Sequence, residues 1–163
     1  STLFPYTTLF RSKQEKRRIP TQLDDFKAPV INTYSIETTV AEKIDAILSL
    51  MEFSSRMKDY YDIYYLSHKF DFEGKVLCEA LSKTFINREH NFTIEQFEQI
   101  MTFDSDDGMQ KKWKAFKKKI DVKMEEFPFI LQSINEFLCE PYTAVIKGTV
   151  FEKYWDANEC SWN

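Results

Sequence analysis

The chain has 163 residues, which fits one domain of ordinary size, and 43% hydrophobic with 16% aromatic residues are enough for a hydrophobic core. A formal net charge of −4 excludes nucleic-acid binding through a basic field spread over the whole molecule. The three cysteines are scattered without a Cys-x-x-Cys pair, which argues against a disulfide framework and a zinc site and favours reduced thiols in the cytoplasm.

The N-terminal residues 2–12, TLFPYTTLFRS, are similar to the translation of a common sequencing-adapter oligonucleotide. We interpret residues 1–12 as an assembly artefact, to be left out of fold reasoning, with the natural protein extending upstream. The alternative is a genuine apolar strand, which LFPYTTLF would also suit. Pro5 and the threonines make the stretch too short and too interrupted to span a membrane.

Residues 13–33 are expected to form an extended connection. The connection opens with the charge run KQEKRR, residues 13–18, which we expect to be either disordered or a solvated entry to the domain. Pro20 and Pro29 disfavour a helix, and the residues after Pro29 could form a short N-terminal edge strand.

Helical periodicity then predicts a mainly α domain over residues 34–163. Ser35 is a suitable N-cap for its first helix, and Thr93 with Gln96 forms a capping-box pattern for its fourth. Pro141 is expected to end the sixth helix, and the aromatic, β-branched residues 142–162 are expected to form a short hairpin or an irregular cap. The predicted helices cover residues 36–51, 56–67, 73–85, 93–101, 107–120 and 128–138.

Two neighbouring predicted helices carry clustered charges. In SRMKDYYDIYYL, residues 55–66, Asp59 and Asp62 are three residues apart and therefore lie on one helix face. In the preceding helix, YSIETTVAEKIDAI, Lys43 lies beside the apolar stripe, near the boundary of the core. From the residues alone, a salt-bridge network that holds the two helices together is favoured. Because neither Lys43 nor Asp59 belongs to an apolar stripe, both are expected to be surface-like.

One face of the predicted helix 107–120 is rich in lysine and lies opposite an apolar stripe. Such a face is usually solvated surface. The alternative is a contact with the phosphate backbone of an RNA substrate. The lysines of this face are Lys111, Lys112, Lys114, Lys117, Lys118 and Lys119.

Taken together, residues 34–47 and 55–66 resemble the AbiEii/AbiGii-type nucleotidyltransferase toxins of bacterial abortive-infection toxin–antitoxin systems. The resemblance continues more weakly through ALSKTFINRE, residues 80–89, and WKAF, residues 113–116. It implies the helical C-terminal portion of a cytoplasmic phage-defence toxin with a cognate antitoxin. It also implies that the full-length protein uses Mg²⁺ and an NTP, and transfers a nucleotide to an acceptor such as tRNA.

The resemblance also assigns roles to individual residues. It implies that Lys43 contacts the nucleotide phosphates, and that Asp59 steers the acceptor proton or completes a metal shell. The candidate supporting residues, which are ambiguous between site and scaffold, are Glu42, Arg56, Lys58 and Asp62.

The metal-binding element of such enzymes, a Gly-rich turn followed by Asp-x-Asp, does not precede Lys43 in this sequence. The one Asp-x-Asp pattern, residues 104–106, is interpreted as a solvated turn. We therefore expect an inactive fragment, in which Asp59 and Asp62 could bind a metal only together with an upstream half. The alternative is a non-catalytic helical module that binds an antitoxin or another protein. A metal-dependent nuclease would need more carboxylates than this face offers.

Overall fold

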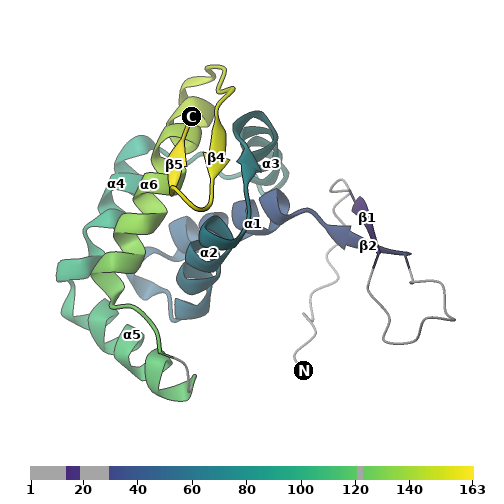
Figure 1. Ribbon diagram of the computed structural model, residues 1–163. Coiled ribbons are helices and arrows are strands. Elements are labelled where there is room, and N and C mark those ends of the chain that lie inside the picture. Colours follow the sequence, from purple (N-terminus) through teal and green to yellow (C-terminus); the bar gives the residue numbers. More distant parts are fainter. Residues whose placement is uncertain (1–13, 19–29, 121–122) are drawn as a thin grey trace, which may run out of the picture. The chain divides into compact units, whose positions relative to one another are not determined.

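The computed structural model describes residues 14–18, 30–120 and 123–163, which belong to two compact units, residues 1–35 and 36–163 (Figure 1). In the first unit, β1 (Gln14–Arg18) pairs antiparallel with β2 (Val30–Tyr34), from Gln14 opposite Tyr34 to Arg18 opposite Val30. The strand after Pro29 agrees with the sequence. Disorder, one of the two alternatives for the charge run, is wrong for residues 14–18, because the ladder to β2 gives their backbone hydrogen-bond partners. The adapter-like residues lie outside the described part of the chain.

The second unit is mainly helical, which confirms the expected fold class, and it ends in a small sheet (Figure 1). Its sheet has the order β3-β4-β5 with antiparallel neighbours. No helix in the described ranges is both long enough and apolar enough to cross a membrane. The helices are α1 (Ile36–Leu50), α2 (Met57–Lys69), α3 (Gly74–Asn87), α4 (Ile94–Met101), α5 (Asp107–Lys119) and α6 (Phe127–Lys147). Two 3-10 turns, η1 (Met51–Phe53) and η2 (Phe103–Ser105), and three strands, β3 (Phe72–Glu73), β4 (Tyr154–Asp156) and β5 (Ser161–Trp162), complete the unit.

Side-chain capping explains where α4 and α5 begin. The Thr93 side chain accepts a hydrogen bond from the Gln96 backbone, and the Gln96 side chain accepts one from the Thr93 backbone, so the predicted capping box is present at α4. Asp106 accepts a hydrogen bond from the backbone of Met109 and caps α5. The Asp-x-Asp pattern at residues 104–106 is therefore part of a helix start, which supports its interpretation as a turn.

The core lies where α6 packs against α2, α3 and α4, with α1 packed against both α2 and α3. Apolar residues at helical spacing on α1, such as Ile44 and Ile47, are fully buried, as are Tyr60 on α2 and Ile134 and Phe137 on α6. Burying each such side chain stabilises the fold by about 1.5–3 kcal/mol. This packing fixes α1 against α2, and these two helices carry the charged motifs.

Helix α6 continues through Pro141 and ends only at Gly148, which has a left-handed φ of 66°. The prediction that Pro141 ends the helix is wrong. A proline has no N–H for the carbonyl four residues earlier, here that of Phe137. The indole Nε1 of Trp162 on β5 donates to this Phe137 oxygen at 2.9 Å instead. The C-terminal sheet thus satisfies the carbonyl that the proline leaves without a helical donor.

The expected C-terminal hairpin is present as β4 and β5, although residues 142–147 belong to α6. The hairpin is held by the indole of Trp155, which donates to the Ser67 carbonyl near the end of α2 at 2.7 Å. It is also held at Gly74, whose N–H donates to the Lys153 carbonyl at 2.8 Å. A Cβ at Gly74 would lie 2.7 Å from that same oxygen, so only glycine fits this close approach.

Candidate functional site

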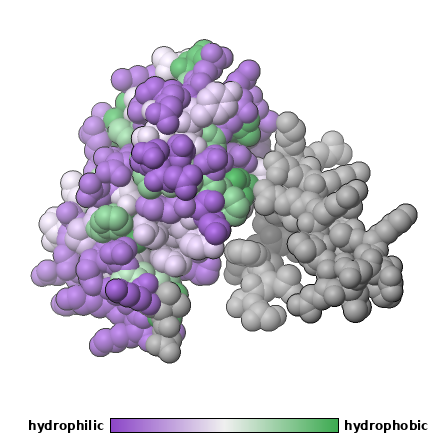
Figure 2. Space-filling view, viewed as in Figure 1, coloured by the Kyte–Doolittle hydropathy of each residue, from purple (hydrophilic) through white to green (hydrophobic). Residues whose placement is uncertain are grey.

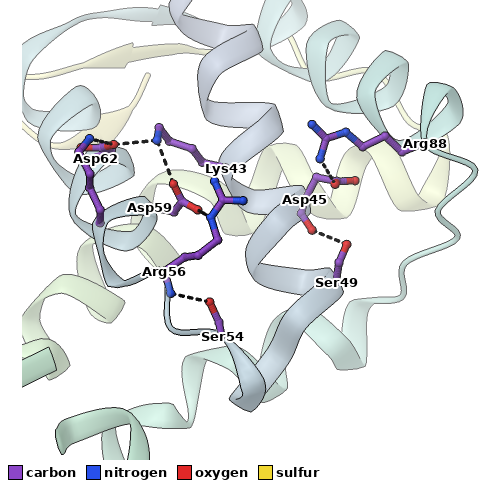
Figure 3. A network of polar contacts seen from close by, with 9 residues as sticks. Lys43, Asp45, Ser49, Ser54, Arg56, Asp59, Asp62 and Arg88 are labelled. Carbon is purple, nitrogen blue, oxygen red and sulfur yellow. Dashed lines mark hydrogen bonds and ion pairs between the residues drawn. The ribbon is translucent and has the colours of Figure 1, made fainter. Parts of the chain in front are cut away.

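The centre of the site is Lys43, which projects from the middle of α1 toward α2 (Figure 3). Its Nζ lies 3.0 Å from Asp59 Oδ1 and 2.7 Å from Asp62 Oδ2. Since the two aspartates are one turn apart on the same face of α2, a single ammonium can reach both. The two charged motifs recognised in the sequence therefore meet in space.

Two exposed cations flank the aspartates. Arg56 Nε lies 2.7 Å from Asp59 Oδ2 and forms an ion pair with it. This oxygen accepts no hydrogen bond of good geometry from any residue that the structure describes. The Lys58 ammonium pairs with Asp62 Oδ2. Ser54, fully buried before α2, accepts a hydrogen bond from the Arg56 backbone at 3.1 Å and fixes the start of the helix (Figure 3). Three cations surround two carboxylates, so the cluster carries a formal charge of +1.

Both central residues are more buried than the sequence indicated. Lys43 is 9% exposed and Asp59 is 4% exposed, so the expectation that they are surface-like is wrong. The reason is tertiary: their side chains fill the contact between α1 and α2, which the apolar stripe of α1 alone did not reveal. A buried pair of this kind depends on both partners, because removing one leaves an uncompensated charge.

The surroundings keep Lys43 charged. Burial by itself lowers the pKa of the Lys43 ammonium, but the hydrogen bonds and negative charges of Asp62 and Asp59 outweigh it and raise that pKa above its usual value. Lys43 is therefore a fixed cation at neutral pH and not a proton acceptor. A fixed, partly desolvated ammonium is suited to binding an anionic group such as a phosphate.

Glu42 does not join this cluster. It is exposed on α1, and the contacts of Lys43 are made with the two aspartates of α2. The structure therefore brings together five of the six residues selected from the sequence and leaves out Glu42.

The residues of this site do not fit a resident Mg²⁺. That ion prefers octahedral oxygen coordination with one or two carboxylates facing it directly. Here the carboxylates of Asp59 and Asp62 face ammonium and guanidinium groups, and the described residues contain no group of three or more His, Cys, Asp or Glu side chains placed to hold a metal. The positive cluster is suited to an anion.

A second polar cluster on α1 was not recognised from the sequence. Asp45 is completely buried, and its carboxylate lies 2.7 Å from Arg88 Nη1 (Figure 3). The same carboxylate lies 2.8 Å from His90 Nδ1. Ser49 Oγ donates to the Asp45 carbonyl at 2.7 Å. A carboxylate within the apolar run IDAIL was the available signal, because a buried charge requires partners. The cluster ties α1 to the segment after α3.

The fold and the site define a mainly helical protein in which a fixed cation lies between two carboxylates of a neighbouring helix. A family model described as "Nucleotidyl transferase AbiEii toxin, Type IV TA system" matches residues 7–137, and the chain belongs to this family of nucleotidyltransferase toxins of type IV toxin–antitoxin systems. The matched residues include α1 and α2 with all five members of the cluster. No curated protein and no solved structure matches the chain.

Proposed function

We propose that Lys43 and Asp59 form the phosphate-binding and acceptor-activating side of a nucleotidyl transfer site. In this proposal the toxin transfers a nucleotide from an NTP, with Mg²⁺, to an RNA acceptor such as tRNA, and an antitoxin counteracts it. Membership in the family supports the reaction class. The single observation that carries the assignment of residues is the placement of Lys43 between Asp59 and Asp62.

Lys43 would bind the phosphates of the nucleotide. Its raised pKa keeps it cationic, and the net positive charge of the cluster favours an incoming anion. An ammonium that already faces two carboxylates is held in place before the nucleotide arrives, which reduces the entropy lost on binding. Such a preorganised charge stabilises the negative charge that develops during phosphoryl transfer.

Asp59 would accept or steer the proton of the acceptor hydroxyl. Its Oδ1 accepts a hydrogen bond from Lys43, whereas its Oδ2 has, among the described residues, only the ion pair with Arg56, whose side chain is largely exposed. A hydroxyl that displaces Arg56 could donate a hydrogen bond to this oxygen. Arg56 would then be a gate to the carboxylate, and Asp62 with Lys58 would help to position Lys43.

Mg²⁺ would help neutralise the phosphates when bound, but Asp59 and Asp62 are not placed to hold it. The proposal therefore assigns metal binding to a Gly-turn and Asp-x-Asp segment outside residues 13–163. For the same reason, we expect no transfer by the chain as given.

The test uses labelled NTPs, Mg²⁺ and total tRNA. The chain alone should give no labelled RNA, and the chain joined to its upstream-encoded segment should label RNA and arrest growth. In the joined protein, Lys43→Ala or Asp59→Ala should lower the rate by about 100-fold or more, as is common for one well-placed catalytic group. Robust labelling by the chain alone would contradict the assignment of metal binding to an outside segment.

The pairing of all five charges favours one second candidate, a non-catalytic module that binds an antitoxin or another protein. The upstream reading frame separates the two. A Gly-turn with Asp-x-Asp encoded upstream supports the enzyme, and a natural start codon near Lys13 supports the module. If the Lys43→Ala or Asp59→Ala variant of the joined protein stays folded and fully toxic, the substituted residue has no catalytic role, which supports the non-catalytic module.

A further inference from the structure

The exposed side of α2 next to the site is aromatic. Tyr61 has its ring centroid 6.1 Å from that of Tyr64 and 6.3 Å from that of Tyr65, and Tyr65 is 49% exposed. At 100° per residue, Tyr65 and Asp62 are within about 60° of each other around the helix. Tyr65 is thus the tyrosine next to Asp62, and Tyr61 and Tyr64 follow it around the helix, at about 100° and about 160° from Asp62.

Two further helices extend this surface. Phe116 of α5 lies 6.5 Å from Tyr61, and Phe129 of α6, which is 46% exposed, lies 6.1 Å from Tyr64, both between ring centroids. We call these five residues, Tyr61, Tyr64, Tyr65, Phe116 and Phe129, the aromatic surface. Rings from three helices that meet at partly exposed positions mark an interaction site more strongly than single exposed hydrophobic residues do.

A strong positive charge borders the aromatic surface. Residues 111–119 of α5 contain six lysines and no acidic residue. Hydrophilic side chains cover α5 in Figure 2, at the lower left of the view. Lys112 and Lys119 are both within about 60° of Phe116 around the helix. The Lys112 ammonium donates to the carbonyl of Glu52 in η1 at 2.7 Å, which places Lys112 beside the turn that leads into α2.

We propose that the aromatic surface and the lysines of α5 bind the single-stranded end of an RNA molecule. Bases stack on Tyr61, Tyr65 and Phe129, while the lysines contact the phosphates. This inference rests on the proposed function and identifies where its RNA acceptor lies. A base on Tyr65 is one helical turn from Asp62, so the terminal nucleotide reaches the Lys43 cluster.

The combination of exposed aromatic rings and lysines is typical of a site for single-stranded RNA. Partly exposed aromatic rings stack on bases of any sequence, provided that the bases are unpaired, and a row of lysines follows the phosphates. A double-stranded RNA hides its base faces within the helix and would leave the aromatic surface unused. Since the whole chain is acidic, attraction of an RNA depends on this local patch.

The first test measures binding of a fluorescein-labelled single-stranded oligoribonucleotide to the chain by fluorescence anisotropy, without NTP. The double variant Tyr65→Ala/Phe129→Ala should bind at least about tenfold more weakly, because each stacked base contributes substantially. The matched control is Tyr154→Ala, which removes an exposed tyrosine from β4, and it should change the Kd less than about twofold. Melting curves establish that each variant is folded.

The second test asks whether RNA binding depends on the lysines of α5 in particular or only on the total positive charge of the protein. The triple variant Lys111→Ala/Lys118→Ala/Lys119→Ala is compared with Lys75→Ala/Lys83→Ala/Lys147→Ala, which removes three lysines that are also exposed but lie elsewhere. Single-stranded binding loses about 0.7 in the slope of log K against log salt per phosphate contact, so the first variant should lower the slope by about 2. The second variant should leave the slope nearly unchanged.

Equal binding by the aromatic variant and its control, equal effects of the two lysine variants, or equal affinity for a duplex would each overturn the proposal. No binding of the oligoribonucleotide, with loss of binding to purified antitoxin in the same variants, would assign the surface to a protein. Because these measurements need no transfer, an inactive chain does not affect them. Conversely, transfer activity of the joined protein that survives the surface variants would overturn this inference and leave the proposed function intact.

Discussion

The ammonium of Lys43 lies 0.3 Å closer to Asp62 than to Asp59, at 2.7 Å against 3.0 Å, although Asp59 is the more buried of the two aspartates. Lys43 is therefore shared between the carboxylates and is not the partner of one alone. The exposed cations each contact a different carboxylate: Arg56 contacts Asp59, and Lys58 contacts Asp62. Loss of Lys43 thus affects both carboxylates, whereas loss of an exposed cation affects one.

This sharing predicts a large difference between two lysines that contact the same aspartate. Lys43→Ala should lower the free energy of unfolding by up to about 3–5 kcal/mol, because it leaves the buried Asp59 without its hydrogen-bond donor. Lys58→Ala should cost less than about 1 kcal/mol, since its side chain is 61% exposed and surface pairs contribute little. Urea denaturation of both variants checks the difference. If Lys43→Ala lowers the free energy of unfolding by less than about 1 kcal/mol, the buried pair contributes no more than an exposed one, and this prediction is wrong.

The raised pKa of Lys43 predicts how its contribution depends on pH. Because the folded-state pKa lies above the usual value of 10.5, the contribution is complete below pH 10.5 and is lost as the pH rises through the folded pKa. The difference in unfolding free energy between wild type and Lys43→Met should thus be constant from about pH 6 to 9 and shrink above pH 10.5. A difference that shrinks already near neutral pH would contradict a fixed cation.

Removing the hydroxyl of Tyr60 should not lower the stability of the protein. Its hydroxyl is buried and has no hydrogen-bond partner within the described part of the chain. Burial, followed by the charge of Asp59, holds the pKa of this phenol above its usual value. Tyr60→Phe should be neutral or stabilising by up to about 1 kcal/mol, because it removes an unsatisfied polar group. The matched control is Tyr142→Phe, which loses a 2.8 Å hydrogen bond to the Thr93 carbonyl and should destabilise. Thermal melts that rank the two variants the other way would refute this account of Tyr60.

Pro141 and Trp162 should be energetically coupled. Trp162→Phe leaves the Phe137 carbonyl without its indole donor and should cost about 1–3 kcal/mol. In a Pro141→Ala background, the restored backbone N–H can occupy that carbonyl, so the same change should cost about 1 kcal/mol less. A double-mutant cycle measures the coupling. Additive effects of the two substitutions would mean that the indole does not replace the missing helical donor.

The sequence alone determined the mainly helical fold, the capping box at Thr93 and the common face of Asp59 and Asp62. These features depend on residues within three or four positions of each other, so local periodicity and capping suffice to predict them. The AEK motif, residues 41–43, and the KDxxD motif, residues 58–62, also sufficed to predict the family. Residues that lie far apart in sequence, such as Lys43 and Asp59, could be expected to approach but not to be buried together.

Only the tertiary structure decided which charges are paired and where α6 ends. Asp45 obtains Arg88 and His90 from a segment more than 40 residues away, and the Phe137 carbonyl obtains Trp162 from the last strand. A local pattern shows that a buried charge needs a charged or hydrogen-bonding partner, and that a proline in a helix leaves a carbonyl without its donor. It does not show which distant group supplies that partner or donor. That group is determined by how the helices pack, and packing alone also placed Lys43 between the two aspartates.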